Sequence, residues 1–151
     1  SKTYSIPGIR VGWVASNTEV ADILRDYRDY TMICAGVFDD MVATLVLENK
    51  EAILERNRQI VEENLALMDV WIAKEPKASW IRPASVSTSF VKLDVDRPIE
   101  EFALELLQEY GVLVVPGNRF DKESHVRIGY CCDKEVLQKG LEKLSQFLNK
   151  C

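Results

Sequence analysis

The chain has 151 residues, of which 47% are hydrophobic and 28% are charged, so its size and composition are those of an ordinary soluble globular protein with a modest core. Its formal net charge is -5 and its lysines and arginines are scattered, which argues against nucleic acid as a partner. The apolar runs are too short to span a bilayer and no secretory signal opens the sequence, so we expect a cytoplasmic protein without membrane contact.

The N-terminal part of the chain predicts a strand followed by a helix. Residues 11–15 are apolar and follow a Pro-Gly turn, as in a short buried strand. The next three residues, Ser16, Asn17 and Thr18, have side-chain oxygens that can cap a helix. That helix is expected over residues 19–30, where apolar residues recur at helical spacing.

Two more helices are expected next. The first covers residues 40–48 after a break that contains Gly36, and Asp39 and Asp40 are interpreted as its caps. The second covers residues 50–74 and has an apolar stripe opposite a charged face. A helix of this length can join two lobes of a protein, but the same pattern is equally typical of an ordinary surface helix.

The rest of the chain predicts a two-layer α+β domain. Its elements are expected in the order strand, strand, helix, strand, strand, helix, which is typical of a sheet packed against one layer of helices. The expected strands are residues 79–81, 89–93, 112–115 and 125–131. The expected helices begin after Pro98 and after Asp133.

Local signals mark the ends of these two helices. Asp96 is expected to cap the first helix, and Pro98 fits its first turn, where no backbone N–H donor is needed. Gly111 suits its C-terminal end, where a left-handed residue is common. Asp133 is expected to cap the second helix. The apolar stripe of that helix consists of Leu137, Leu141, Leu144 and Leu148.

The four cysteines and the single histidine do not form a metal-binding or redox pattern. The cysteines are Cys34, Cys131, Cys132 and Cys151. Since none has the two-residue spacing of such sites, we expect no metal site and interpret the cysteines as reduced thiols. His125 could serve as a base, but a position at a strand edge or in a loop is the interpretation that we favour.

The first thirteen residues place Lys2 eight positions before Arg10, with a Pro-Gly turn between them. A catalytic lysine must lose its proton near neutral pH to form a Schiff base, and a nearby positive charge favours that loss. An arginine can also bind a phosphate through two parallel hydrogen bonds. The residue types alone do not decide for catalysis, because a lysine near a chain end is usually solvated and Pro-Gly is common in turns.

The sequence Ser-Lys-Thr-Tyr, followed by Pro-Gly-Ile-Arg-Val-Gly-Trp, resembles the cofactor-lysine segment of class I/II aminotransferases. These are fold-type I enzymes that depend on pyridoxal 5'-phosphate (PLP). The resemblance implies that Lys2 is the Schiff-base lysine and catalytic proton shuttle, and that Arg10 binds the PLP phosphate. The serine that such enzymes use a few residues before the lysine would lie upstream of this sequence, so Ser1 is not assigned to that role.

A second stretch strengthens the resemblance. Residues 111–120 (GVLVVPGNRF) and residues 125–129 (HVRIG) are similar to the C-terminal lobe of the same family. The resemblance implies that Arg127 binds the substrate α-carboxylate as a bidentate pair. On spacing alone Arg127 is more typical of a surface ion pair, and Arg119 is interpreted as a surface residue.

The resemblance implies an α/β (α+β) architecture in which the chain is the C-terminal part of an aminotransferase. Residues 1–49 would end the large PLP-binding domain, residues 50–74 would form the connecting helix, and residues 75–151 would form the small C-terminal domain. The intact enzyme would transfer an amino group between an amino acid and a 2-oxo acid, with its site completed across a homodimer interface. We expect the isolated chain to be inactive, because the other cofactor-binding residues would lie upstream. An N-terminus that is not the natural one would also hide a secretory signal.

Two alternative functions stay open at this point. A fold-type I PLP lyase or decarboxylase would use the same lysine, since the reaction depends on which substrate bond lies perpendicular to the imine plane. A non-enzymatic α+β binding module, in which Lys2 is incidental, belongs to another class. The side-chain specificity of a substrate does not follow from this sequence.

Overall fold

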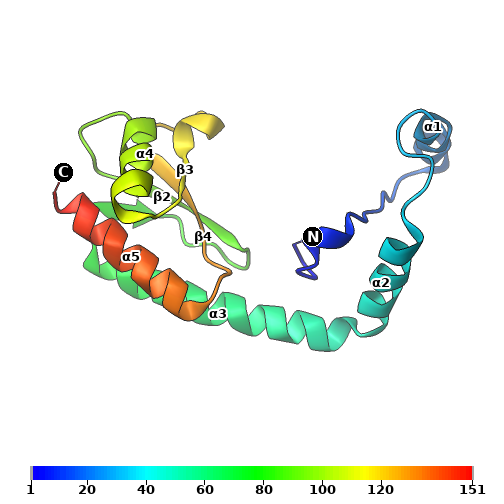
Figure 1. The fold of residues 1–151 in the computed structure, drawn as a ribbon, viewed down its shortest axis with the longest axis horizontal. Helices are drawn as coiled ribbons and strands as arrows, with labels where there is room; N and C mark the ends of the chain where they lie inside the picture. Colours follow the sequence, from blue (N-terminus) through cyan, green and yellow to red (C-terminus); the bar gives the residue numbers. More distant parts are fainter. Residues whose placement is uncertain (1, 151) are drawn as a thin grey trace. The chain divides into compact units, whose positions relative to one another are not determined.

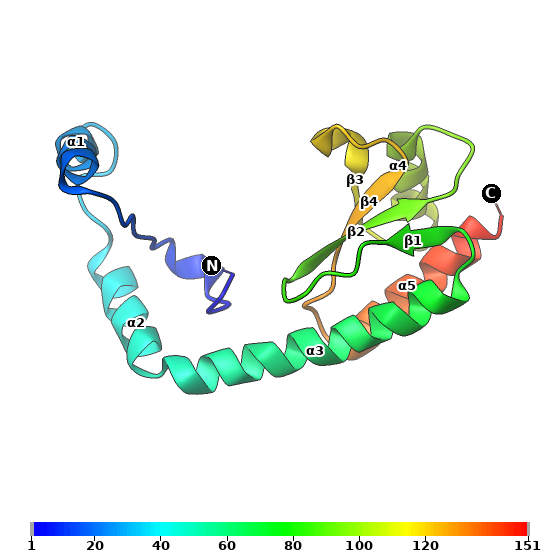
Figure 2. The same cartoon turned by 180° about the vertical axis from the view of Figure 1, so that it is seen from behind.

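The computed structural model of the chain describes residues 2–150, which form two compact units divided between Asn57 and Arg58. Figures 1 and 2 show the elements of each unit from opposite sides. Helix α3 (Lys50–Lys74) contributes its first turns to the first unit and its longer remainder to the second. Its bounds are those predicted from the amphipathic pattern.

The first unit also contains a 3-10 turn, η1 (Pro7–Ile9), and the two predicted helices, α1 (Thr18–Arg28) and α2 (Val37–Glu48). Of the three candidate caps of α1, Asn17 is the N-cap, because its Oδ1 accepts a hydrogen bond of 3.0 Å from the Val20 N–H. The strand expected over residues 11–15 is wrong: the described residues 10–17 have no regular structure. No described strand pairs with them, and an extended segment without a partner cannot satisfy its backbone groups as a strand does.

The caps expected for α2 are also wrong. Its N-cap is Gly36, without a side-chain hydrogen bond, and Asp39 and Asp40 lie inside the first turn. Carboxylates there stabilise the helix by interacting with the positive end of its dipole.

The helices of the first unit expose their apolar side chains. Neither α1 nor α2 contains a buried residue, and Tyr30 and Phe38 are 88% and 83% exposed. Other large apolar side chains that are exposed in this unit include Ile23, Leu24, Tyr27, Val37, Met41 and Leu45. The first unit therefore has amphipathic helices without a closed core of its own among the described residues.

The second unit contains a four-stranded antiparallel sheet in the order β1-β2-β4-β3. The strands are β1 (Ala78–Trp80), β2 (Thr88–Leu93), β3 (Val115–Pro116) and β4 (His125–Gly129). The register pairs Phe90 of β2 and Val115 of β3 with Arg127 of β4. The long hydrogen-bonded pairing of β2 with β4 therefore places Arg127 in the middle of the sheet.

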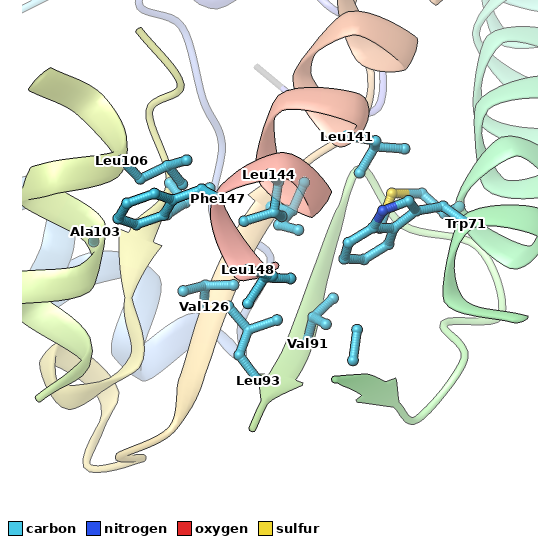
Figure 3. Packing of buried hydrophobic residues seen from close by; sticks show 14 of the residues in the cluster. Trp71, Val91, Leu93, Ala103, Leu106, Val126, Leu141, Leu144, Phe147 and Leu148 are labelled. Carbon is cyan, nitrogen blue, oxygen red and sulfur yellow. The ribbon is translucent and has the colours of Figure 1, made fainter. Parts of the chain in front are cut away.

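Helices α3, α4 (Ile99–Tyr110) and α5 (Lys134–Leu148) bury one face of this sheet. Figure 3 shows side chains of α5 between Trp71 of α3 and Leu106 of α4, close to strand residues such as Val91 and Val126. The predicted stripe of α5 is buried throughout. Burial of each large apolar side chain contributes about 1.5–3 kcal/mol, so this layer is the main source of stability.

The other face of the sheet is open. Along β2 and β4 the buried residues Ser89, Val91, Leu93, Val126 and Ile128 alternate with residues that are exposed or half-buried. The alternating residues on the open face are Thr88, Phe90, Lys92, His125, Arg127 and Gly129. The period of two is that of a sheet with one solvated face, and the predicted two-layer α+β class is confirmed.

Of four local predictions in this unit, two are confirmed. Gly111 ends α4 in the left-handed region (φ 66°) and Asp133 Oδ1 accepts a hydrogen bond of 2.9 Å from the Glu135 N–H, as expected. Asp96 does not cap α4, because the N-cap is Pro98 and no side chain bonds there. The strand expected over residues 112–115 is reduced to β3, since only its last residue and Pro116 pair with β4.

Candidate functional site

Lys2 lies in a tight turn of the first unit. The Ser5 N–H donates to the Lys2 carbonyl at 3.2 Å, and Ser5 adopts a left-handed conformation with φ 54°. Asn57 of α3 donates through Nδ2 to the Thr3 carbonyl at 2.8 Å, which ties the turn to the helix. The Lys2 side chain is exposed and makes no ion pair within residues 2–150, so its amine stays available to a ligand.

Arg10 follows η1 and is also left-handed, with φ 44° and ψ 34°. For a residue other than glycine this conformation costs about 1–2 kcal/mol, and such strain often occurs at ligand-binding segments. The Arg10 Nη1 donates to the Pro7 carbonyl at 2.8 Å, which folds the guanidinium back over its own turn. Among the described residues no carboxylate pairs with Arg10, so its other N–H donors are free for an anion.

Lys2 and Arg10 thus supply two unpaired cationic groups on one short irregular segment. A primary amine can form an imine with a carbonyl group, whereas a guanidinium binds phosphate or carboxylate through parallel hydrogen bonds. Together they suit a ligand with one carbonyl carbon and one anionic group. The spacing of the two residues predicted this role, but the left-handed backbone at Ser5 and Arg10 had no signal in the sequence.

Arg127 belongs to the second unit, on the open face of β4. Its guanidinium carbon lies 5.1 Å from the centre of the Phe120 ring. Within the described part of the chain its side chain has no hydrogen bond and no ion pair. Every other arginine of the second unit has a carboxylate partner. These pairs are Arg58–Glu62, Arg82–Asp69, Arg97–Glu105 and Arg119–Glu100.

This contrast separates Arg127 from the surface ion pairs that spacing alone favoured. An arginine whose charge is not neutralised by the chain keeps its five N–H donors for an external carboxylate. Arg119, by contrast, is 62% exposed by side chain and bonded to Glu100, in agreement with its interpretation as a surface residue. Lys2 and Arg10 belong to one unit and Arg127 to the other.

His125 begins β4 and is half-buried. Its ring stacks on Phe90, with ring centres 5.0 Å apart and planes at 18°, and its Nδ1 lies 2.9 Å from the Glu123 carbonyl. The residue is therefore held at the strand edge by packing, which is the position that we favoured over a role as base. Sequence reasoning missed the aromatic neighbours of Arg127, of which only Phe90 had a signal, in the alternation of β2.

The cysteines described by the structure, Cys34, Cys131 and Cys132, are free and exposed, whereas Cys151 lies outside the described residues. Although Cys131 as a residue is exposed, partial burial of its thiol raises its pKa, and the neighbouring Cys132 raises the pKa further. Residues 2–150 contain no group of three or more His, Cys, Asp or Glu side chains that could hold a metal ion. No helix in this range is long and apolar enough to cross a membrane.

The sequence and the fold correspond to a known family. The sequence pattern of the family Aminotransferase class I and II matches residues 1–144, and the chain belongs to this family. The resemblance seen in the two sequence stretches is thereby confirmed.

Individual relatives agree with this assignment. Capreomycidine synthase of Streptomyces vinaceus is 29% identical over 149 residues, which are 98% of this chain and 38% of that enzyme. The probable N-acetyl-LL-diaminopimelate aminotransferase of Bacillus subtilis (strain 168) is 26% identical over 159 residues, covering 99% and 39%. The crystal structure of a PLP-dependent aminotransferase from Streptococcus suis 89-1591 is similar with a TM-score of 0.96 and 68% identity, over 98% of this chain and 40% of that one. The chain therefore spans about two fifths of the length of these relatives.

Proposed function

We propose that this chain is the C-terminal part of a PLP-dependent aminotransferase, which moves an amino group between an amino acid and a 2-oxo acid. Family membership and the similarity to the Streptococcus suis enzyme support the proposal. The observation that carries it is one short segment, left-handed at Ser5 and Arg10, that presents the exposed amine of Lys2 and the guanidinium of Arg10, neither with a carboxylate partner among the described residues.

The residues present fit PLP. Lys2 would hold the cofactor through a Schiff base with its aldehyde, and Arg10 would bind its phosphate with the donors that Pro7 leaves free. When bound, PLP supplies an electron sink for the bond broken at the substrate Cα. The amine of Lys2 would also move the proton at the substrate Cα.

Arg127 would bind the α-carboxylate of both substrates. Its unpaired guanidinium can make two parallel charge-assisted hydrogen bonds, which fix the orientation of the carboxylate as well as its position. Orientation matters because the bond at Cα that breaks must be held in a defined direction. Both the amino acid and the 2-oxo acid have this carboxylate, so one arginine serves both half-reactions.

The proposal extends to the organisation of the complete enzyme. Residues 1–49 form the end of the PLP-binding domain, residues 50–74 form the helix that connects the two domains, and residues 75–151 form the small domain. The active site is completed by upstream residues and by the second subunit of a homodimer in the cytoplasm. On this basis the isolated chain has no turnover with PLP, an amino acid and a 2-oxo acid, and ordinary turnover of the chain alone would contradict it.

The test of the site uses the full-length protein. Mixed with PLP, it should show an imine absorbance that Lys2→Ala removes, whereas Lys50→Ala, an exposed lysine outside the segment, leaves it unchanged. Arg127→Ala should raise KM for amino acids about 10- to 100-fold, as expected for the loss of a charged hydrogen-bonded pair. Arg82→Ala, which removes a surface ion pair, is the matched control. An imine absorbance that persists in Lys2→Ala would exclude Lys2 as the attachment point.

A second candidate function has support of its own, because one relative is named a synthase rather than an aminotransferase. In that case Lys2 would serve another reaction of the same fold, such as elimination or decarboxylation. Product analysis separates the two candidates. Transamination converts the donor into its 2-oxo acid while the acceptor gains the amino group, whereas elimination releases ammonia and decarboxylation releases carbon dioxide without an acceptor.

A further inference from the structure

The ring of Phe120 contacts the guanidinium of Arg127, with the guanidinium carbon 5.1 Å from the ring centre. We propose that Phe120 is a positioning residue, which holds Arg127 in the orientation that receives the substrate carboxylate. The proposal rests on the carboxylate-binding role of Arg127 given above. Phe120 is thereby added to the carboxylate-binding site, although neither its residue type nor its position in the sequence indicates a positioning role.

The contact restricts the conformations of the Arg127 side chain without using its hydrogen-bond donors. An arginine side chain has many rotamers, and ordering it on binding costs free energy. A cation over an aromatic ring is attracted by the ring's negative face. The ring accepts no conventional hydrogen bond, so the five N–H donors of the guanidinium stay free for a carboxylate. A carboxylate partner from the chain would also order Arg127, but it would compete with the substrate.

Phe120 is held from several sides. It ends the 3-10 turn η2 (Gly117–Phe120), and its ring meets Phe90 edge to face, with centres 5.8 Å apart and planes at 84°. The middle of the turn is tied to Glu100 of α4, which accepts a hydrogen bond of 2.7 Å from Asn118 Nδ2 and pairs with Arg119. The turn and the Phe90 contact thus orient the ring, which is 45% exposed, without a contribution from Arg127.

The start of the same turn is fixed by close packing. A Cβ on Gly117 would lie 2.2 Å from the Lys122 carbonyl oxygen and 2.6 Å from that of His125, so only glycine fits there. Pro116, just before it, pairs with Val126 of β4, the neighbour of Arg127. The turn that presents Phe120 and the strand that presents Arg127 are thus parts of one rigid arrangement.

The experiment uses the full-length enzyme with Phe120→Leu, Phe120→Ala, Phe120→Trp and the control Leu113→Ala, an exposed apolar residue. Leucine keeps an apolar side chain but has no aromatic face, whereas tryptophan keeps the face. We expect Phe120→Leu and Phe120→Ala to raise KM for the amino acid and the 2-oxo acid about 3- to 30-fold, with Phe120→Trp and Leu113→Ala close to the parent. The PLP absorbance stays unchanged, which also serves as the check of folding.

Two further readouts separate positioning from a merely structural role. The single-turnover reaction of the corresponding amine, which lacks the α-carboxylate, should proceed equally well in the parent and in Phe120→Leu. In an Arg127→Ala background Phe120→Leu should have no further effect, because the two residues act as one unit. Equal losses for the amine and the amino acid, additive effects, or a KM within twofold of the parent would overturn the proposal.

The variant Arg127→Ala shows which of the two proposals fails. If Arg127→Ala itself leaves KM unchanged, the carboxylate-binding role of Arg127 fails and the positioning role fails with it. If Arg127→Ala raises KM but Phe120→Leu does not, only the positioning role of Phe120 is wrong.

Discussion

Tyr130 and Asn64 show how single polar groups hold the second unit together. Tyr130 is fully buried after β4, and its hydroxyl donates to the Val86 carbonyl. Asn64, also buried, donates from Nδ2 to the carbonyls of Tyr130 (2.7 Å) and Cys132 (2.8 Å). One amide of α3 thus satisfies two backbone acceptors of the chain that leaves β4, where the strand ladder has ended.

Asn64→Ala should therefore destabilise the second unit by about 2 kcal/mol, because the buried carbonyls lose their partner. The measurement is the urea denaturation of the 151-residue chain followed by far-UV circular dichroism. Glu63→Ala is the control, because Glu63, the neighbour of Asn64 on α3, makes only an exposed ion pair with Lys134 at 3.9 Å. A midpoint for Asn64→Ala equal to that of the control would contradict this account of α3.

Ionisation of Tyr130 should make the stability of the chain depend on pH in the alkaline range. Burial raises the pKa of Tyr130 above its ordinary value of 10.0. The folded chain then keeps the proton more tightly than the unfolded chain, so the contribution to stability is complete below about pH 10 and is lost as pH rises through the raised pKa. Urea midpoints between pH 9 and pH 11.5 should fall more steeply for the parent than for Tyr130→Phe. Parallel curves would show that Tyr130 ionises as freely in the folded state as in the unfolded state.

For single residues, the sequence identified the charged side chains but not the residues that contact them. Lys2, Arg10 and Arg127 were identified by residue type and by the stretches around them. That Arg127 lacks a carboxylate while its four companions have one depends on which acidic residues the fold brings near each arginine. The role of Phe120 depends on a turn whose geometry needs contacts with Lys122 and His125, and these are not visible in a linear pattern.

Among the elements, the helices were predicted more closely than the strands. Helix α3 has the predicted bounds and α4 ends at Gly111, because periodicity and caps are local signals. The strands expected over residues 11–15 and 112–115 failed in whole or in part. A strand exists only where another strand pairs with it, so an apolar run is not sufficient.

Two glycines in different elements should respond to alanine with opposite signs. Gly117→Ala should destabilise the second unit by about 1–3 kcal/mol, since its Cβ would overlap backbone oxygens in η2. Gly140→Ala, in the middle of α5 with no atom within 4 Å of the added Cβ, should stabilise it by about 0.5–1 kcal/mol through helix propensity. Urea midpoints of the two variants bracket the parent value if both assignments hold. Equal shifts of both variants would mean that the turn accommodates the methyl group.

On the scale of the whole molecule, the two units differ in how much they bury. The second has a continuous core from three helices and a sheet, whereas the helices α1 and α2 of the first contain no buried residue. A segment with few buried contacts opens easily and is cut readily by proteases. The sequence predicted amphipathic helices here but not the absence of a local core, because periodicity does not reveal what covers an apolar stripe.

Limited proteolysis of the 151-residue chain should therefore cut first before Asn57, within α1, α2 or the segments around them. A resistant fragment that begins near Arg58 should accumulate, and mass spectrometry identifies its ends. Initial cleavage within β2, β4 or α5 would be inconsistent with this difference in burial.

The open face of the sheet has an evolutionary consequence. The residues that hold the second unit together point toward the helices, while Arg127, Phe90 and Lys92 point the other way. Substitutions at the exposed positions of the open face, such as Lys92, thus change what can bind there at little cost in folding free energy. Under the proposed function, selection can then alter substrate preference one residue at a time, while the scaffold that presents the arginine is inherited intact.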